Sequence, residues 1–240
     1  FFSNMIPNLI LFNSKSAINI HLKLGYTNPN IYFIPNGFDT KKFLPSEKIR
    51  KNFKLRHGIS KNTFLIGMVS RDDPLKNNEG ALKVIKILKD ENLDIRLVVI
   101  GKHLDRNNVK FLNKIFKYNL NNNVILKGFK KNIERIIPAF DCLIIPSHAE
   151  AFPNVLGEAM SCEIPCIVTD VGDCKSIVSD IGMVVKKNDM LHMAKEIKNF
   201  FYLTKINKNK IKKRARKIII ENYNIEKIAK MFEIHYKIKN

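Results

Sequence analysis

The chain contains 240 residues, 45% of them hydrophobic, which allows a substantial core in one large domain or in one domain plus part of another. Its formal charge of +20 at pH 7 raises three candidate partners: nucleic acid, an anionic membrane surface and an anionic substrate. Because the lysines are spread along the chain without interleaved exposed aromatic residues, we predict no binding to nucleic acid. Peripheral contact with an acidic membrane surface is the stronger alternative.

The apolar stretch near the N-terminus is too short for a membrane span, and it lacks the basic start and cleavage site of a signal peptide. Since the chain opens in mid-pattern with Phe1, we expect a piece of a longer protein. The cysteines lie in or beside apolar runs, which favours buried thiols over disulfides or a metal site; they are Cys142, Cys162, Cys166 and Cys174. We therefore predict a cytoplasmic protein, whose charge would allow peripheral contact with the inner face of the cell membrane.

The first elements are short and joined by polar turns. A strand is predicted over residues 9–12, followed by a helix that begins after Ser14 and ends before Gly25. A second strand over residues 31–34 ends sharply at Pro35, and a helix is expected over residues 48–57.

From Phe64 onward, strand and helix patterns alternate with short connections. Apolar runs predict strands over residues 64–69, 95–100, 124–126, 142–145, 166–169 and 183–185. Amphipathic spacing predicts helices over residues 77–91, 109–118, 132–140 and 153–162, and then over 190–203, 208–223 and 225–238. The alternation indicates an α/β protein with a Rossmann-like, doubly wound parallel sheet.

The stretch from Pro146 to Met160 contains the best candidate site. Glu150 lies in the loop after a predicted strand, Pro153 fits the first turn of the next helix, and Glu158 lies in its early turns. Open α/β sheets bind ligands at the carboxyl ends of their strands. The N–H groups of a helix start attract phosphate, and carboxylates accept hydrogen bonds from hydroxyls. The stretch therefore indicates a nucleotide or sugar phosphate ligand.

A second polar group follows the strand at residues 64–69. Arg71 can bind a phosphate through two parallel bonds and Lys76 can add a mobile charge, so together they could neutralise a diphosphate leaving group. The alternative is that Arg71 pairs with Asp72 or Asp73. A metal site at these aspartates lacks further ligands, so we predict none.

Two nearby features receive structural interpretations. The loop at residues 170–173 contains two carboxylates, which we expect to cap the following helix. His148, close to Glu150, is interpreted as a structural or solvent-facing histidine rather than a catalytic base.

The order of these motifs resembles that of retaining glycosyltransferases with the GT-B fold, the large family 4 type (glycosyl transferases group 1). Glu150 to Glu158 resembles the family's glutamate–seven residues–glutamate motif, although Ala151 stands where glycine is commoner. Arg71 and Lys76 resemble its phosphate-binding arginine and lysine. Further similarity covers the inter-domain crossing, the strand after the motif helix and the closing helix, at residues 34–45, 164–172 and 223–227.

The resemblance implies a role for each candidate residue. Arg71 and Lys76 would hold the diphosphate of a nucleotide sugar, usually UDP- or GDP-linked, while Glu150 would contact its sugar and Glu158 its ribose. The nucleobase would lie near Gly128, Phe129 and Lys130, and the helix start would add phosphate contacts from Phe152, Pro153, Asn154, Val155 and Leu156. A hydroxyl of a glycan or lipid-linked acceptor would attack the anomeric carbon with retention. No metal or other cofactor would be obligatory.

The resemblance also divides the chain into three parts. Residues 1–37 would be a remnant of the N-terminal acceptor domain with the crossing, residues 38–223 the donor domain, and residues 224–240 a helix that crosses back. It implies that this piece binds the donor and that only the intact parent transfers the sugar, in bacterial surface polysaccharide or lipopolysaccharide biosynthesis.

Three other functions remain as alternatives. A glycoside hydrolase could use Glu150 and Glu158 as its carboxylate pair, but it has no diphosphate for Arg71 and Lys76 to neutralise. A basic module could bind nucleic acid or a membrane surface without catalysis. A dinucleotide-dependent oxidoreductase would need a glycine fingerprint after the first strand of the regular domain, which the sequence lacks.

Overall fold

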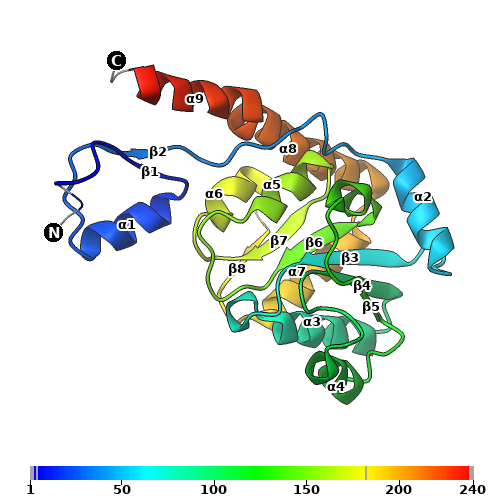
Figure 1. The fold of residues 1–240 in the computed structure, drawn as a ribbon. Coiled ribbons are helices and arrows are strands. Elements are labelled where there is room, and N and C mark those ends of the chain that lie inside the picture. Colours follow the sequence, from blue (N-terminus) through cyan, green and yellow to red (C-terminus); the bar gives the residue numbers. More distant parts are fainter. Residues whose placement is uncertain (1–2, 4, 182, 238–240) are drawn as a thin grey trace.

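The computed structural model describes residues 3, 5–181 and 183–237, the side chain of residue 237 excepted. Among these residues, six parallel strands form one sheet with helices on both faces (Figure 1). In the spatial order β5-β4-β3-β6-β7-β8, they are Val124–Leu126, Ile95–Ile100, Phe64–Val69, Cys142–Ile145, Cys166–Thr169 and Val184–Val185. The predicted α/β class with a doubly wound parallel sheet is confirmed.

Side chains that alternate along the strands divide the interior into two layers. Along β3, Phe64 and Ile66 face a core shared with α3 (Asn78–Asp90), α4 (Val109–Lys117) and α7 (Met190–Tyr202). Leu65 faces the opposite core, which is covered by α5 (Asn154–Ser161), α6 (Cys174–Val178) and α8 (Lys205–Tyr223), together with Phe53. This burial on both faces explains why the strands read as continuous apolar runs.

The strand order reverses between β3 and β6. β4 and β5 continue on one side of β3, whereas β6, β7 and β8 extend on the other. In sheets of this kind the connections on the two sides diverge, and they leave a crevice outside the carboxyl ends of the two central strands. The loops that follow β3 and β6 contain Arg71, Lys76 and Glu150. The fold thus places the predicted site residues at one edge.

The N-terminal part is a small unit beside this domain. β1 (Ile10–Phe12) and β2 (Ile31–Phe33) pair in parallel and flank α1 (Lys15–Lys23). The chain then crosses to the main domain, reaches α2 (Glu47–Arg56), and returns toward the unit through α9 (Ile225–Lys237; Figure 1). Phe38 in the outgoing crossing bonds to the start of the returning helix, because its N–H donates to the Tyr223 carbonyl at 2.8 Å and its carbonyl accepts from Ile225 at 3.0 Å.

Some local predictions were wrong. The helix predicted over residues 132–140 consists of two short 3₁₀ turns, Ile133–Arg135 and Ile137–Ala139, because Pro138 lacks the N–H that an α-helix would need. Asp173 precedes α6 but does not cap it. Its carboxylate instead accepts hydrogen bonds from the backbone N–H groups of Lys15 and Ser16, at 2.7 and 3.0 Å, at the start of α1.

Other local predictions hold, with shifted boundaries. α8 begins at Lys205, three residues earlier than predicted, after a cap by Thr204. The predicted end of the last helix at residue 238 lies outside the described residues. All four cysteines are buried and free, as predicted.

We expect Gly67→Ala to destabilise the fold at the β3–β6 junction. A Cβ at Gly67 would lie 2.1 Å from the Phe140 ring, which is fully buried and has no room to move away. Overpacking of this kind typically costs about 1 to 3 kcal/mol of unfolding free energy, which urea denaturation measures. Phe140→Leu is the matched second change, because a smaller side chain relieves the overlap. The double variant should therefore lose less than the two single losses added, and simple additivity would contradict the packing described.

Candidate functional site

A cleft of about 530 Å³ opens at the carboxyl ends of β3, β4 and β6. This volume lies within the range of about 300 to 1,000 Å³ that is typical of small-molecule sites. The residues that line it include Ser70, Arg71, Lys76, Gly101, Lys102, Phe129, Lys130, Ile133, Pro146, Ser147, Glu150, Pro153, Asn154 and Val155. The cleft therefore occupies the position in which open α/β sheets bind ligands.

An ion pair between Lys76 and Glu150 lies at the centre of the cleft. Lys76 Nζ is 2.8 Å from both carboxylate oxygens of Glu150, and Ser147 Oγ donates to Oε1 at 2.7 Å. The side chain of Glu150 is only 8% exposed and that of Lys76 is 23% exposed, so salt and water screen this pair weakly. These bonds fix the carboxylate in one orientation as a hydrogen-bond acceptor.

The loops that carry the pair are bonded to each other. Asn77, whose φ of 50° is in the left-handed region, accepts from Gly80 N–H at the start of α3 and donates to the Pro146 carbonyl, both at 3.0 Å. His148 N–H donates to the Leu75 carbonyl at 2.7 Å. The position of Lys76 relative to Glu150 therefore depends on backbone contacts as well as on the charges. This contact uses only the backbone of His148 and does not test the interpretation of its side chain, whose Nδ1 is buried without a hydrogen-bond partner among the described residues.

Gly172 packs closely against the backbone of the loop that contains Glu150. Its φ is +56°, and a Cβ there would lie 2.2 Å from the Glu150 carbonyl oxygen. Only glycine allows the β7–α6 connection to approach the Glu150 backbone this closely.

Arg71 is an exposed cation of the cleft. Its side chain is 71% exposed, and Nη2 lies 3.5 Å from Asp73 Oδ2, which is a long and weak ion pair. The pairing with Asp73 that the sequence left open therefore exists but leaves Arg71 able to turn toward an anion. Lys102 and Lys130 also line the cleft, so four cations face one carboxylate among its described residues. An anionic ligand would balance this excess.

The structure brings most of the predicted site residues together and sets others apart. One cleft contains Arg71, Lys76, Phe129, Lys130, Glu150, Pro153, Asn154 and Val155. Gly128 is buried, and the side chains of Phe152 and Leu156 belong to the core beneath α5. For Phe152 and Leu156, the prediction concerned only their backbone N–H groups. Pro153 makes no side-chain cap, but its carbonyl accepts from the Leu156 N–H in the first turn of α5 at 3.1 Å.

Glu158 lies in a second hollow, of about 450 Å³, between α5, the crossing segment and α9. Asn154, one turn earlier on α5, lines both hollows, so the two are neighbours. Burial raises the pKa of Glu158 to about 7; Lys42 opposes this effect and Glu134 adds to it. Within the described residues, one carboxylate oxygen of Glu134 is itself buried without a hydrogen-bond partner. Glu134 does not line this hollow, whose carboxylates among the described residues are those of Asp39 and Glu158.

Sequence reasoning missed Ser147 and Lys102. Each lies within two residues of the carboxyl end of a strand, β6 or β4, and each lines the cleft. The rule that selected Arg71 after β3 would have found both.

Metal-binding clusters and membrane-spanning helices are both absent from the described residues. The stretches 5–181 and 183–237 contain no group of three or more His, Cys, Asp or Glu that could hold a metal ion. In the same part of the chain, no helix has the length and apolar character needed to cross a membrane.

Comparison with known proteins identifies the family. Residues 49–231 match the model of the family described as glycosyl transferases group 1. The chain belongs to this family. The Escherichia coli UDP-Gal:alpha-D-GlcNAc-diphosphoundecaprenol alpha-1,3-galactosyltransferase is 31% identical over 176 residues, which are 71% of this chain and 45% of that protein. The putative glycosyltransferase EpsF of Bacillus subtilis is 28% identical over 65% of this chain and 40% of its own length. The chain thus spans less than half of either relative.

Solved structures confirm the GT-B type fold of this glycosyl transferases group 1 chain. Anabaena HepE (Alr3699), solved with UDP and glucose, superposes with a TM-score of 0.89 at 21% identity, over 98% of this chain and 64% of HepE. WaaG, a glycosyltransferase involved in lipopolysaccharide biosynthesis, superposes with a TM-score of 0.81 at 18% identity, over 93% of this chain and 61% of WaaG. The predicted fold and the predicted membership of glycosyl transferases group 1 are confirmed.

The raised pKa of Glu158 predicts a pH-dependent stability. Between pH 4.5 and about 7 the folded chain keeps a proton on this carboxyl that the unfolded chain releases. Its contribution to the unfolding free energy therefore falls as pH rises through that window. Glu158→Gln should lose less stability than the parent between about pH 5 and about pH 7.5, by on the order of 1 to 3 kcal/mol.

Urea denaturation at the two pH values measures this difference. Glu233→Gln, an exposed change of the same chemistry on α9, is the control and should follow the parent. An identical pH response of Glu158→Gln and the parent would show that Glu158 is ionised throughout.

Proposed function

We propose that this chain forms the donor-binding part of a retaining glycosyltransferase, which transfers a sugar from a UDP- or GDP-sugar to an acceptor hydroxyl. The observation that carries the proposal is the cleft in which Arg71 and Lys76 face Glu150 at the reversal of the strand order. A nucleotide sugar combines the two features that such a cleft recognises, a diphosphate and a set of hydroxyls. HepE, which has the same fold, was solved with UDP-glucose, and this supports the donor class.

In this proposal the diphosphate lies between Arg71, Lys76 and the start of α5. Arg71 is free to leave Asp73, whose exposed pairing is weak, and to bind two phosphate oxygens. Lys76 can share its three N–H donors between Glu150 and the phosphate. Negative charge grows on the diphosphate as its bond to the sugar breaks, and fixed cations stabilise that charge more than they stabilise the intact donor.

Glu150 and Glu158 receive different roles. Glu150, oriented by Lys76 and Ser147, accepts hydrogen bonds from the donor sugar. Glu158, in the adjoining hollow beyond Asn154, accepts them from the ribose. The exposed Phe129 ring and Ile133, at the rim of the cleft, offer an apolar surface to the base.

Retention follows when the acceptor attacks from the face that the diphosphate leaves. The acceptor oxygen forms a bond to the anomeric carbon, the bond from that carbon to the phosphate oxygen breaks, and the acceptor proton passes to the departing diphosphate. No protein carboxylate forms a covalent intermediate in this scheme, and no metal is required. Glu150, already bonded by a lysine through both oxygens, suits an acceptor role better than that of a general acid.

This arrangement disfavours the hydrolase alternative. A pair of hydrolytic carboxylates must flank one glycosidic bond. Glu150 and Glu158 instead line different hollows.

The acceptor and the pathway are proposed from the relatives. The E. coli enzyme is named for a diphosphoundecaprenol-linked substrate, and CapM of Staphylococcus aureus for capsular polysaccharide biosynthesis. We propose an acceptor of this glycan or lipid-linked class in bacterial surface polysaccharide or lipopolysaccharide biosynthesis. The acceptor would bind to a domain of which residues 1–37 form a part, and residues 224–237 would lead back to it. The net charge of +20 suits a cytoplasmic protein that works peripherally at an anionic membrane.

A thermal-shift screen tests the donor class. UDP, GDP and ADP, each alone and as common sugar conjugates, are added to the chain at several concentrations. At about 100 times Kd, a ligand stabilises the folded state by roughly 2.7 kcal/mol, which raises Tm by on the order of 5 °C in a domain of this size. One nucleotide class should stabilise the chain and the others should not. A flat response to all three would contradict donor binding.

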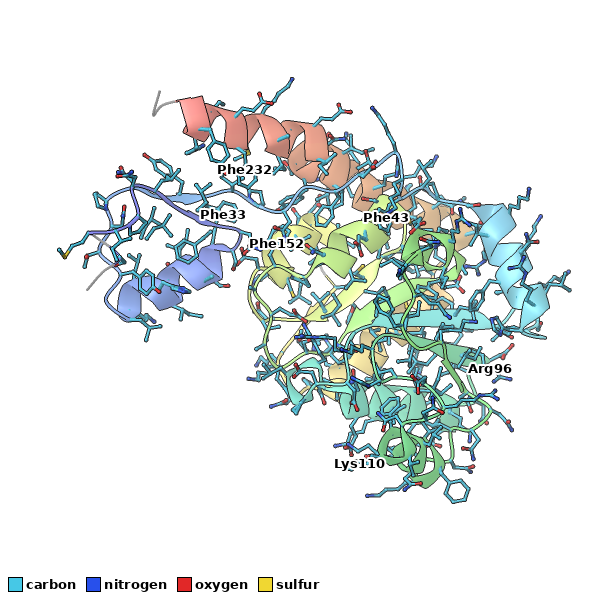
Figure 2. All side chains as sticks on the ribbon, in the orientation of Figure 1. Phe33, Phe43, Arg96, Lys110, Phe152 and Phe232 are labelled. Atoms are coloured by element: carbon cyan, nitrogen blue, oxygen red, sulfur yellow. The ribbon has the colours of Figure 1, made fainter. Side chains whose placement is uncertain are left out.

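Arg71→Ala should separate phosphate recognition from base recognition. It should weaken binding of the preferred nucleoside diphosphate by about tenfold to a hundredfold, because one charge-assisted contact is lost. Binding of the matching nucleoside should change little. Calorimetric titration of both ligands gives the ratio, and Lys110→Ala, an exposed change on α4 (Figure 2), is the control. Equal losses for nucleotide and nucleoside would refute the phosphate role.

A further inference from the structure

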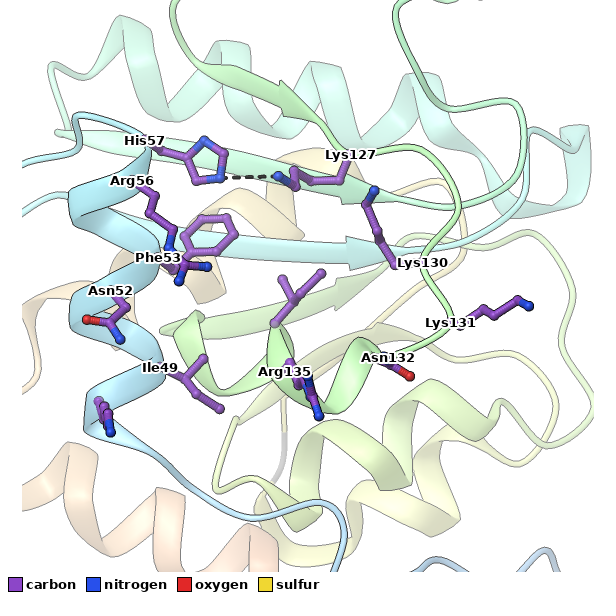
Figure 3. A pocket seen from close by; sticks show the side chains of 12 residues that line it. Ile49, Asn52, Phe53, Arg56, His57, Lys127, Lys130, Lys131, Asn132 and Arg135 are labelled. Atoms are coloured by element: carbon purple, nitrogen blue, oxygen red, sulfur yellow. Dashed lines mark hydrogen bonds between the residues drawn. The ribbon is translucent and has the colours of Figure 1, made fainter.

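A third hollow, of about 830 Å³, lies between α2 and residues 127–136 (Figure 3). Lys130 lines both this hollow and the donor cleft, so residues 127–136 form a wall between the two. None of the described residues that line it is acidic. We name it the basic pocket. The proposed donor role does not use it.

Six cations line the basic pocket, on both of its walls. They are Lys48 and Arg56 on α2, and Lys127, Lys130, Lys131 and Arg135 on the opposite segment. Among the residues that the structure describes, none of the six forms an ion pair, and no acidic side chain lines the hollow to oppose their charges. Like charges held around one hollow repel each other, which costs folding free energy unless an anion occupies it.

One contact within the pocket joins two basic groups. Lys127 Nζ lies 3.3 Å from His57 Nε2, the dashed line in Figure 3, and both side chains are half-buried. Burial lowers the pKa of His57, and the charges of Lys127 and Arg56 lower it further. Burial also lowers the pKa of Lys127, with Lys130 adding to the effect. A bound anion would favour the charged form of both groups.

The pocket also has an apolar floor. Ile49, Phe53 and Ile136 line it, and Lys127 Nζ lies 5.9 Å from the centroid of the Phe53 ring. A floor of this kind, with cations around it, suits a ligand that combines a compact anionic group with a less polar body. One monovalent anion would leave most of the six cations unbalanced, whereas a diphosphate brings several charges into one place.

We propose that the basic pocket is a binding site for a phosphate-rich ligand, whose diphosphate or paired phosphates contact Arg56, Lys127 and Arg135. The phosphates can belong to a free small molecule or to a lipid headgroup, because the recognition chemistry is the same. Extended nucleic acid fits less well, because the cations line one hollow. In addition, the Phe53 ring is buried in the floor of this pocket, whereas single-stranded nucleic acid stacks its bases on aromatic rings. The site is separate from the donor cleft, so its occupancy does not depend on the proposed donor role.

The test uses inorganic pyrophosphate and phosphatidylglycerol vesicles as probes of the two sources. Every protein carries Arg71→Ala, which weakens the donor cleft as a competing site. Binding is followed by calorimetry or sedimentation and by the NMR signal of the His57 imidazole, assigned with His57→Gln. The pocket variant is Arg56→Glu with Lys131→Glu, both exposed and outside the donor cleft. The matched control is Lys110→Glu with Lys213→Glu, which changes the net charge equally at exposed positions outside the basic pocket.

We expect saturable binding that shifts the His57 signal and that the pocket variant weakens by about tenfold or more, while the control variant binds like the parent. Pyrophosphate binding would indicate a free ligand, and binding to vesicles alone would indicate a lipid headgroup. Equal weakening in the pocket and control variants would overturn the proposal, because binding would then reflect diffuse charge. An unmoved His57 signal would overturn it as well. So would an RNA oligonucleotide that binds more tightly than either probe.

Discussion

The ion pair between Lys76 and Glu150 is the contact on which the rest of the candidate site depends. It joins the loop after β3 to the loop after β6, across the point where the strand order reverses. Removal of one partner would leave the other as a poorly solvated charge, which is far more costly than the loss of a surface pair. Because the side-chain amide of Asn77 and the backbone N–H of His148 join the same loops, the pair holds its geometry before any ligand arrives. Preorganised charge of this kind is what transition-state stabilisation requires.

The surplus of positive charge has a spatial pattern that composition does not reveal. Some lysines on the outer helices pair with nearby carboxylates, as Lys86 with Asp90 and Lys198 with Glu91. The donor cleft gathers four cations against the one carboxylate of Glu150, and no described acidic residue lines the basic pocket. Composition sets the total charge, whereas the fold decides where cations gather without matching carboxylates. These hollows are therefore the better guide to where anions bind.

Much of the fold follows from the sequence, because a strand buried on both faces leaves an apolar run that few other structures produce. Five of the six strands of the main sheet were predicted with their observed ends, Phe64–Val69 among them. The positions of Arg71, Lys76 and Glu150 at one edge followed from their place in the loops after predicted strands of a parallel sheet. What could not be predicted depends on contacts distant in sequence. Asp173 caps a helix more than 150 residues away, and Glu158 turns to a different hollow from Glu150, although both belong to one motif.

The motif helix α5 also explains how the N-terminal crossing influences the site. Gly157 is required there because a Cβ would lie 2.2 Å from the Phe38 ring, which stacks on Phe152 at 6.2 Å. The backbone of Phe38 in turn forms hydrogen bonds with Tyr223, at the end of α8, and with Ile225, at the start of α9. The crossing, the returning helix and α5 thus pack as one layer (Figures 1 and 2). A shift of the N-terminal unit would therefore act on α5 directly, and through it on both hollows at once. The family motif is then a structural element that joins the donor cleft to the rest of the protein, as well as a source of ligand contacts.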